Sequence, residues 1–359
     1  MNDRPIGVGV IGCGEIAQLM HLPYLHEMPE FRIAALCDLS LTLVERLGDH
    51  YGVAGRHADH RALLADPGVD AVVICTYDHG PFVADAIAAG KHVLVEKPLA
   101  FTSDEARPLV AAAERAGVVA MVGYMKLFDP GFEAGKARIA KLESPLSIRV
   151  HDFAGRFDRY GALYDQIRPT DVPADVLAAG RAAVEARIDA ALGLDHVAYR
   201  DLYFTILMLG SHDLAVLRDL FGAPERVAYA RAVGPNHVMA VLDMRGGTPC
   251  VLEIAFGAQY EWWDEGVEVR GLRESVGIEF QNPYWRNASA IVHVREAVGD
   301  GPSSRIVPGM PDTSFRREWR HFASAIRDRQ AVRSPLEGGL ADLDLAMAII
   351  KALPPRRTR

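Results

Sequence analysis

The chain has few cysteines, no long apolar run and no excess of basic residues. Its cysteines lie in or beside apolar stretches without metal-ligand spacing, so we expect reduced core residues and no metal site. No apolar run approaches the ~18 residues that cross a bilayer, and the N-terminus lacks the pattern of a signal peptide. These absences predict a cytoplasmic protein. The cysteines are Cys13, Cys37, Cys75 and Cys250.

The formal net charge of −8 gives no basic surface, so we expect neither nucleic acid nor a membrane as partner. Half of the 359 residues are apolar, which is enough for a sizeable core. At about 150 residues per domain, this length predicts two domains or one large one.

What the chain does contain is a glycine-rich turn after its first apolar run. Ile6–Ile11 leads into Gly12-Cys13-Gly14-Glu15-Ile16-Ala17, a G-x-G-x-x-A turn. The first glycine permits a sharp turn from strand to helix, and the second lets backbone approach a pyrophosphate. The N–H groups that open the helix favour negative charge there. We expect the dinucleotide to contact Gly12, Gly14, Glu15 and Ile16.

Asp38 ends the second apolar run, 21 residues after Ala17. An acid at this place accepts hydrogen bonds from the ribose hydroxyls of a dinucleotide. It repels a 2′-phosphate, and no Arg or Lys follows at residues 39–41, so we expect NAD rather than NADP. The alternative is a surface aspartate that caps the next helix.

The first third of the chain alternates buried-strand patterns with helical patterns, which predicts a doubly wound parallel sheet, a Rossmann domain over residues 1–123. Pro23 predicts a break near Leu22, and Thr102 with Glu105 predicts a capping box before a helix kinked at Pro108. The expected strands are Ile6–Ile11, Ile33–Cys37, Ala71–Cys75, His92–Val95 and Val118–Val122. The expected helices lie near Glu15–Met28, Leu41–Tyr51, Arg61–Ala65, Pro81–Ala89 and Asp104–Ala116.

After Gly123 the pattern changes to a second α/β domain, residues 124–359, with an open, mainly antiparallel sheet covered on one face. Its final helices could pack back on the first domain. Asp129 and Pro130 are typical of a helix start. Expected strands are Leu146–Phe153, Val227–Val233, His237–Asp243, Pro249–Phe256, Gly266–Gly271, Ser275–Phe280 and Ala290–Val294. Expected helices are Ala174–Leu192, Asp195–Phe221, Thr313–Arg329 and Gly338–Leu353.

A buried strand ends in Glu96-Lys97-Pro98. Ligands of open parallel sheets bind at the carboxyl ends of the strands. A lysine fixed there could hydrogen-bond a substrate hydroxyl and stabilise alkoxide charge. The alternative is an exposed loop lysine paired with Glu96.

Six motifs can be read together: the turn Gly12–Ala17, Asp38, Thr76-x-x-His79, Ala89-Gly90-Lys91-His92-Val93, Glu96-Lys97-Pro98-Leu99 and, further on, Gly210-x-His212 with Leu220-Phe221-Gly222. Together they resemble the glucose–fructose oxidoreductase / inositol 2-dehydrogenase (Gfo/Idh/MocA) family. The resemblance implies NAD(P)-dependent hydride transfer on a sugar, polyol or related hydroxy compound, usually by a homodimer or homotetramer. The resemblance is strong in sequence over Ile6–Met125. Beyond Met125 it lies in the expected architecture more than in the sequence.

The resemblance assigns catalytic roles to Lys97 and His212. Many family members carry an Asp four residues before that histidine, where this chain has Met208. Asp213, directly after His212, is a third catalytic candidate, but it points about 100° further round a helix and need not replace that Asp. A histidine also suits proton removal from an alcohol. The alternative for His212 is a buried structural histidine.

Other candidates rest on position alone. Thr76, His79 and Glu96 lie on the expected cofactor side, and Tyr124, Lys126 and His151 could touch substrate. Asp152, Arg156, Tyr160 and Tyr164 are weaker candidates for substrate contact. Tyr260, Trp262 and Trp263 could stack on a sugar, but we favour a subunit interface through the C-terminal sheet.

Three functions remain open from the sequence. The first is a dehydrogenase for a secondary alcohol of a carbohydrate-like substrate. The second is a redox-neutral enzyme that recycles bound NAD for epimerisation or glycosidic-bond cleavage. The third is a non-catalytic sensor of NAD or a sugar, which need not keep Glu96-Lys97-Pro98.

Overall fold

A computed structural model describes residues 4–155, 162–257, 262–299 and 301–356, and it divides the chain into two compact units. Unit 1 contains Met1–Gly123, Gly161–Ile188 and Glu318–Leu340. Unit 2 contains Tyr124–Tyr160, Asp189–Arg317 and Ala341–Arg359. The sequence predicted a first domain of 1–123, and unit 1 begins with that range but also takes two later segments. No helix in the described ranges is long and apolar enough to cross a membrane.

Unit 1 holds a parallel sheet of six strands in the order β3-β2-β1-β4-β5-β6. The order reverses between β1 and β4, the point where doubly wound sheets bind ligands. This confirms the predicted Rossmann architecture, and only the three-residue edge strand β3 was missed. The strands are β1 Ile6–Ile11, β2 Phe31–Cys37, β3 Gly55–His57, β4 Ala71–Ile74, β5 His92–Glu96 and β6 Ala120–Gly123. The helices between them are η1 Ala17–His21, α1 Leu22–Glu27, α2 Leu41–Tyr51, α3 His60–Ala65, α4 Gly80–Ala88 and α5 Ser103–Ala116.

The break expected at Pro23 is confirmed and takes the form of a π turn. In η1 the Leu22 N–H bonds the carbonyl of Ala17, five residues back, and α1 begins at Leu22 with Pro23 in its first turn. Pro23 has no N–H to offer, so a start at this point leaves no donor unsatisfied. The predicted capping box at Thr102 and Glu105 is present before α5, and Pro108 lies inside that helix.

The C-terminal part of unit 1 packs against its N-terminal part. Trp319 is fully buried, with its ring edge-on to Phe31 at 5.1 Å and to His21 at 5.7 Å. Ser334 donates through Oγ to the carbonyl of Val122 at 2.8 Å and accepts from its N–H through the backbone. Residues 318–340 therefore complete both the core and the β6 edge of this unit.

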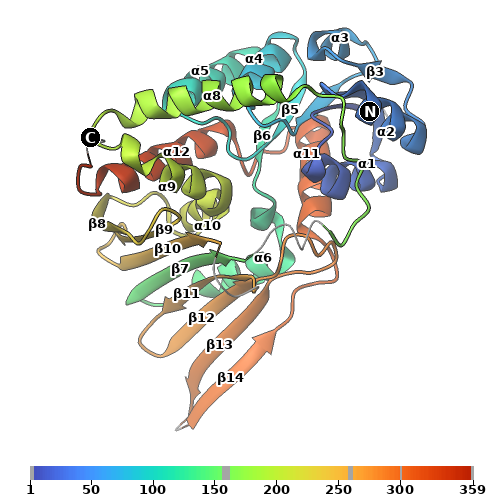
Figure 1. Cartoon of the computed structure of the whole chain (residues 1–359). Coiled ribbons are helices and arrows are strands. Elements are labelled where there is room, and N and C mark those ends of the chain that lie inside the picture. Colours follow the sequence, from blue (N-terminus) through green and yellow to red (C-terminus); the bar gives the residue numbers. More distant parts are fainter. Residues whose placement is uncertain (1–3, 156–161, 258–261, 300, 357–359) are drawn as a thin grey trace. The chain divides into compact units, whose positions relative to one another are not determined.

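Unit 2 holds an eight-stranded sheet in the order β14-β13-β12-β11-β7-β10-β9-β8, seen as a fan in Figure 1. Only β7 and β10 pair in parallel, so the predicted mainly antiparallel sheet is confirmed. Edge strand β14 was missed. The strands are β7 Ser147–Ala154, β8 Arg226–Ala232, β9 His237–Asp243, β10 Pro249–Phe256, β11 Asp264–Arg270, β12 Glu274–Phe280, β13 Ile291–Val298 and β14 Gly301–Val307.

Helices of unit 2 cover one face of this sheet, with α6 against β12 and β13, and α10 against β7. Asp129 caps α6, as the sequence predicted, by accepting from the N–H groups of Gly131 and Phe132 at 2.8 and 3.0 Å. Further helices in the described residues are η2 Met125–Phe128, α6 Pro130–Ile139, α8 Ala174–Leu192, η3 Val197–Tyr199, α9 Arg200–Thr205, η4 Ile206–Gly210, α10 Ser211–Phe221, α11 Ser314–Asp328 and α12 Leu336–Lys351.

The helical stretch expected over Asp195–Phe221 is helical from Val197 onward, but it is not one regular helix. The chain instead forms a short 3₁₀ turn, the helix α9, a π turn over Ile206–Gly210 and then α10. A Cβ on Gly210 would stand 2.2 Å from Cδ1 of Ile254. Glycine therefore lets this segment approach β10 closely, just before His212.

Two other glycines give a matched test of how much close backbone packing contributes to stability. A Cβ on Gly131 would lie 1.9 Å from the carbonyl oxygen of Ala290, whereas a Cβ on Gly180 in α8 would meet no atom within 4 Å. Gly131→Ala should lower the free energy of unfolding by at least about 1–3 kcal/mol. Gly180→Ala should raise it by up to about 1 kcal/mol through helix propensity. Urea denaturation of both variants would measure this, and equal effects would contradict it.

Candidate active site

The glycine turn of unit 1 has the shape that a dinucleotide needs. Gly12 has φ +86°, and a Cβ there would lie 2.7 Å from the backbone of Cys75 and Thr76, so only glycine fits. Around Gly14 no atom lies within 4 Å of the position of a Cβ, which leaves room for a pyrophosphate close to the backbone. Glu15 is exposed and Ile16 half-buried at the same turn. The residues present fit a bound dinucleotide.

Asp38 lies beside this turn. Its Oδ2 accepts from the N–H of Cys13 at 2.7 Å, and its Oδ1 accepts from the N–H of Ser40 at 2.9 Å. A carboxylate has about four lone-pair directions, so both oxygens can still accept from ribose hydroxyls. Helix α2 is capped by Ser40, whose Oγ accepts from Leu43 at 3.0 Å, and not by the Asp38 side chain.

Glu96, at the end of β5, is held in place by hydrogen bonds to other residues of unit 1. Its Oε1 lies 2.9 Å from Nε2 of the fully buried His21, and its Oε2 accepts from the N–H of Lys97 at 3.2 Å. Burial alone would raise the pKa of Glu96, but His21 and Lys97 lower it below its ordinary value. The carboxylate therefore stays charged. Sequence reading missed His21, because nothing in its apolar surroundings indicates this partner.

Lys97 is half-buried, and its peptide bond to Pro98 is cis. The carbonyl of Pro98 lies 2.6 Å from Nδ1 of His79, a buried histidine whose pKa is lowered, mainly by burial. The neutral ring donates to that carbonyl and so fixes the loop that carries Lys97. Thr76 donates to the carbonyl of Asp78 at 2.9 Å and shapes the neighbouring loop.

Unit 2 buries a lysine among three carboxyl groups. Lys126 pairs with Glu265, and oxygens of Glu265, Asp152 and Asp213 lie within 4.8 Å of one another. Burial would lower the pKa of Lys126, but these acids raise it above its ordinary value. The pKa of Asp213 is raised well above the usual range, by burial and then by the charges of Glu265 and Asp152. Lys126 therefore supplies the positive charge that the three acids surround.

His212 stands next to Asp213 in the first turn of α10. It is half-buried, and its ring meets that of Tyr124 edge-on with centroids 6.2 Å apart. Tyr124 is 1% exposed, and its pKa is raised well above the usual range, by burial and then by Asp342. Arg218, which holds Asp342 through two bonds of 2.9 and 3.0 Å, lies over the Tyr124 ring. The structure therefore places the Tyr124 ring next to the His212 ring.

His151 does not join this group. Along β7 the even-numbered residues Ile148, Val150, Asp152 and Ala154 are buried, and the odd-numbered ones face the other side. His151 therefore lies on the open face of the sheet, where its Nε2 is 2.9 Å from Oδ1 of Asp264. Its neighbour Asp152 faces the helices and the lysine cluster.

Several softer candidates can be located only in part. Arg156, Tyr160 and Tyr260 lie outside the described residues. Tyr164 is half-buried in unit 1. Trp262 is 72% exposed on the open face, and Trp263 donates through Nε1 to Glu265 at 2.9 Å.

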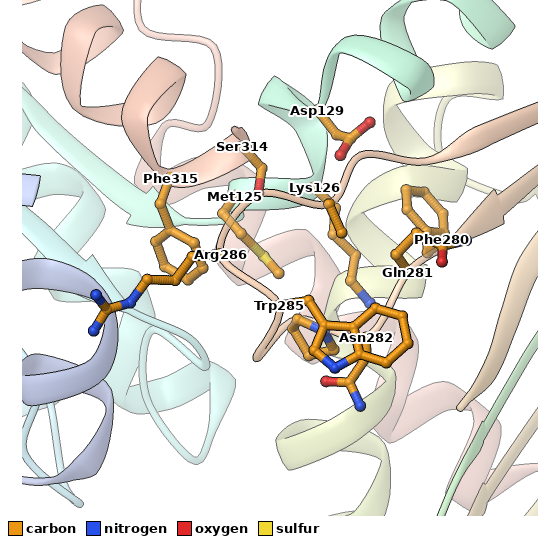
Figure 2. A pocket seen from close by; sticks show the side chains of 12 residues that line it. Met125, Lys126, Asp129, Phe280, Gln281, Asn282, Trp285, Arg286, Ser314 and Phe315 are labelled. Atoms are coloured by element: carbon orange, nitrogen blue, oxygen red, sulfur yellow. The ribbon is translucent and has the colours of Figure 1, made fainter. Parts of the chain in front are cut away.

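A small cavity of unit 2 borders Lys126 (Figure 2). Met125, Lys126 and Asp129 line it from one segment, and the end of β12 and the residues after it line it from another. Its volume of about 20 Å³ holds roughly one water and no sugar.

Comparisons with known proteins agree with these motifs. Residues 6–124 match the family described as "Oxidoreductase family, NAD-binding Rossmann fold". The uncharacterized oxidoreductase YrbE of Bacillus subtilis is 34% identical over 365 residues, covering 98% of this chain and 95% of its own. An inositol 2-dehydrogenase of Paracoccus denitrificans is 38% identical over 162 residues, covering 44% of this chain and 47% of its own. That match spans about half of the relative.

Solved structures show the same fold over nearly the whole chain. A putative NADPH-dependent oxidoreductase from Desulfitobacterium hafniense covers 97% of this chain and 95% of its own, with a TM-score of 0.78 and 18% identity. The 3-ketoreductase KijD10 of Actinomadura kijaniata, in complex with NADP, covers 97% and 98%, with a TM-score of 0.72 and 22% identity.

The lysine cluster predicts a strong dependence of stability on Lys126. Lys126→Met would leave three buried acids without their cation and should lower the free energy of unfolding by about 3–5 kcal/mol. Lys136→Met is the matched control, because its 2.7 Å pair with Asp219 is more exposed and should be worth less than about 1 kcal/mol. Chemical denaturation checks both. A loss at Lys126 no larger than at Lys136 would show that the cluster does not need the lysine charge.

Proposed function

Since the chain belongs to the Gfo/Idh/MocA family of NAD(P)-dependent oxidoreductases, we propose that it oxidises a secondary alcohol of a cyclic polyol or sugar, or reduces the matching ketone. One observation carries this proposal. The intact Glu96-Lys97-Pro98 sequence ends β5 in the same sheet whose β1 turn has the geometry for a dinucleotide. A protein that only sensed the cofactor would not need that lysine.

The substrate class rests on the relatives. They include inositol 2-dehydrogenases and a D-glucoside 3-dehydrogenase of Escherichia coli that is 32% identical over 121 residues. Both names describe a ring with several secondary hydroxyls. We extend that class, and no single sugar, to this chain.

Lys97 and His212 have separate roles in the proposed reaction. Gly12, Gly14 and Asp38 would hold a dinucleotide whose nicotinamide would supply the hydride chemistry at the carbinol carbon. Lys97 donates a hydrogen bond to the substrate oxygen and stabilises its developing negative charge. His212 takes the hydroxyl proton during oxidation and returns it during reduction. Tyr124 stays protonated beside the His212 ring and helps fix its orientation.

Asp38 supports NAD as the cofactor. Its carboxylate stands beside the glycine turn through the bond from Cys13, where the adenosine ribose of a dinucleotide belongs. A 2′-phosphate at that place would meet a negative charge rather than an arginine or lysine.

We also propose self-association through the open face of the unit 2 sheet. That face carries a shallow hollow whose lining includes His151, Trp262, Glu268 and His293. Trp262 is 72% exposed there, which is typical of an aromatic side chain that another surface covers.

Turnover of the purified protein with NAD and a panel of inositols and glucosides tests the enzyme proposal. Lys97→Ala and His212→Asn should each lower kcat about a hundredfold or more. Lys141→Ala, an exposed lysine, should leave kcat unchanged. Unchanged turnover in Lys97→Ala would refute the role of that lysine. Cofactor that stays bound while the substrate is epimerised, with no net NADH, would favour the redox-neutral alternative.

Sedimentation velocity tests the proposed interface. The wild-type protein should sediment as a dimer or tetramer. Trp262→Asp, which places a charge on the open face, should shift it toward a monomer. Val298→Asp, at an exposed residue near the end of β13, is the comparison and should shift it less. A monomeric wild type would rule out the proposal.

A further inference from the structure

Residues 162–173, called the strap here, belong to unit 1 although they follow β7 in the chain. Ile167 and Gln18 make a pair of hydrogen bonds, from Gln18 Nε2 to the Ile167 carbonyl at 3.1 Å and from the Ile167 N–H to Gln18 Oε1 at 2.9 Å. Gln18 also donates to the carbonyl of Cys13 at 3.0 Å. The strap is thus tied directly to the dinucleotide turn.

The same strap reaches the start of α2 with Asp171. Ser40 donates through Oγ to Asp171 Oδ1 at 2.5 Å, and the N–H of Thr42 donates to Asp171 Oδ2 at 3.0 Å. The backbone N–H of Ser40 meanwhile donates to Asp38 Oδ1 at 2.9 Å. One serine therefore bonds both carboxylates, and the two acids stand side by side.

The chain beyond the strap is anchored in the same unit. Arg187, on α8, lies 2.6 Å from Asp78 and 2.5 Å from Glu105. With Ile167 before Asp171 and Arg187 after it, contacts within unit 1 hold the strap on both sides of the acid.

Position decides what Asp171 does. The N–H groups at the start of a helix attract anions, and the start of α2 follows directly on the ribose-binding acid. A 2′-phosphate on the ribose would need hydrogen bonds from the N–H groups at the start of α2. Asp171 already accepts from the Thr42 N–H and the Ser40 hydroxyl, and it places a second negative charge there. The bonds from Ser40 and Thr42 lower the pKa of Asp171 to about 2, so it is charged at neutral pH.

We propose that Asp171 is a second residue that selects NAD against NADP, acting from the strap beside Asp38. The inference rests on the proposed use of NAD and deepens it. Asp38 accepts the ribose hydroxyls, while Asp171 fills the anion position that NADP would need. Selection then depends on a segment that lies 131 residues beyond Ser40 in sequence.

Calorimetric titration of the full-length protein with NAD and with NADP tests the inference without any sugar. Asp171→Asn keeps the shape and removes the charge. It should tighten NADP binding about tenfold, because a unit charge and a phosphate a few ångströms apart repel even in water. Its Kd for NAD should change less than twofold. Asp165→Asn removes an equal charge from an exposed part of the strap and should change neither Kd.

Each other outcome has a definite meaning. If Asp171→Asn leaves the ratio of the two Kd values within twofold while Asp38→Asn shifts it, the inference fails and the NAD proposal stands. If Asp171→Asn weakens both cofactors equally, Asp171 only supports the fold and the inference also fails. A wild-type protein that binds NADP more tightly than NAD overturns both.

Discussion

The hydrogen bond between His21 and Glu96 connects the two motifs on which the chemistry of unit 1 depends. His21 belongs to the helical segment that follows the glycine turn, and Glu96 precedes Lys97 at the end of β5. A buried carboxylate without this partner would pay a desolvation cost of several kcal/mol. Glu318, a fully buried neighbour, has a pKa raised well above the usual range by burial and then by the charge of Glu96. The bond from His21 thus fixes the Glu96 carboxylate at the residue before Lys97.

Both π turns in the described ranges adjoin a candidate functional residue. One, Ala17–His21, follows the dinucleotide turn and brings in His21; the other, Ile206–Gly210, precedes His212. A π turn inserts an extra residue and rotates every later side chain about the helix axis. The first has a visible cause in Pro23, and the second coincides with the close approach of Gly210 to β10. Local irregularity thus sets the direction of side chains that regular helices would point elsewhere.

Local patterns made much of this protein predictable from sequence. Strand burial and turn geometry depend on a few neighbouring residues. Short sequence patterns were therefore enough to predict the Gly12–Ala17 turn, Asp38 and the strand before Glu96. Edge strands β3 and β14 were missed because Gly55–His57 and Gly301–Val307 carry no apolar run. The partners were missed for another reason: His21 with Glu96, Lys126 with Glu265 and Asp171 with Ser40 meet across 75 to 139 residues of chain. No spacing rule reveals such pairs.

The assembly of unit 1 from three separate segments has a consequence for its synthesis. Trp319 fills the space against His21 and Phe31, and Ser334 closes the β6 edge. While the ribosome is still making the chain, the N-terminal sheet waits for residues added roughly 200 positions later, on the order of 10–40 s at usual elongation rates. During that interval the apolar surface that Trp319 covers in the complete chain lacks its partner, and transiently exposed surface of this kind is prone to aggregation. A chimaera that kept only residues 1–123 of unit 1 would lack Trp319 and Ser334 permanently.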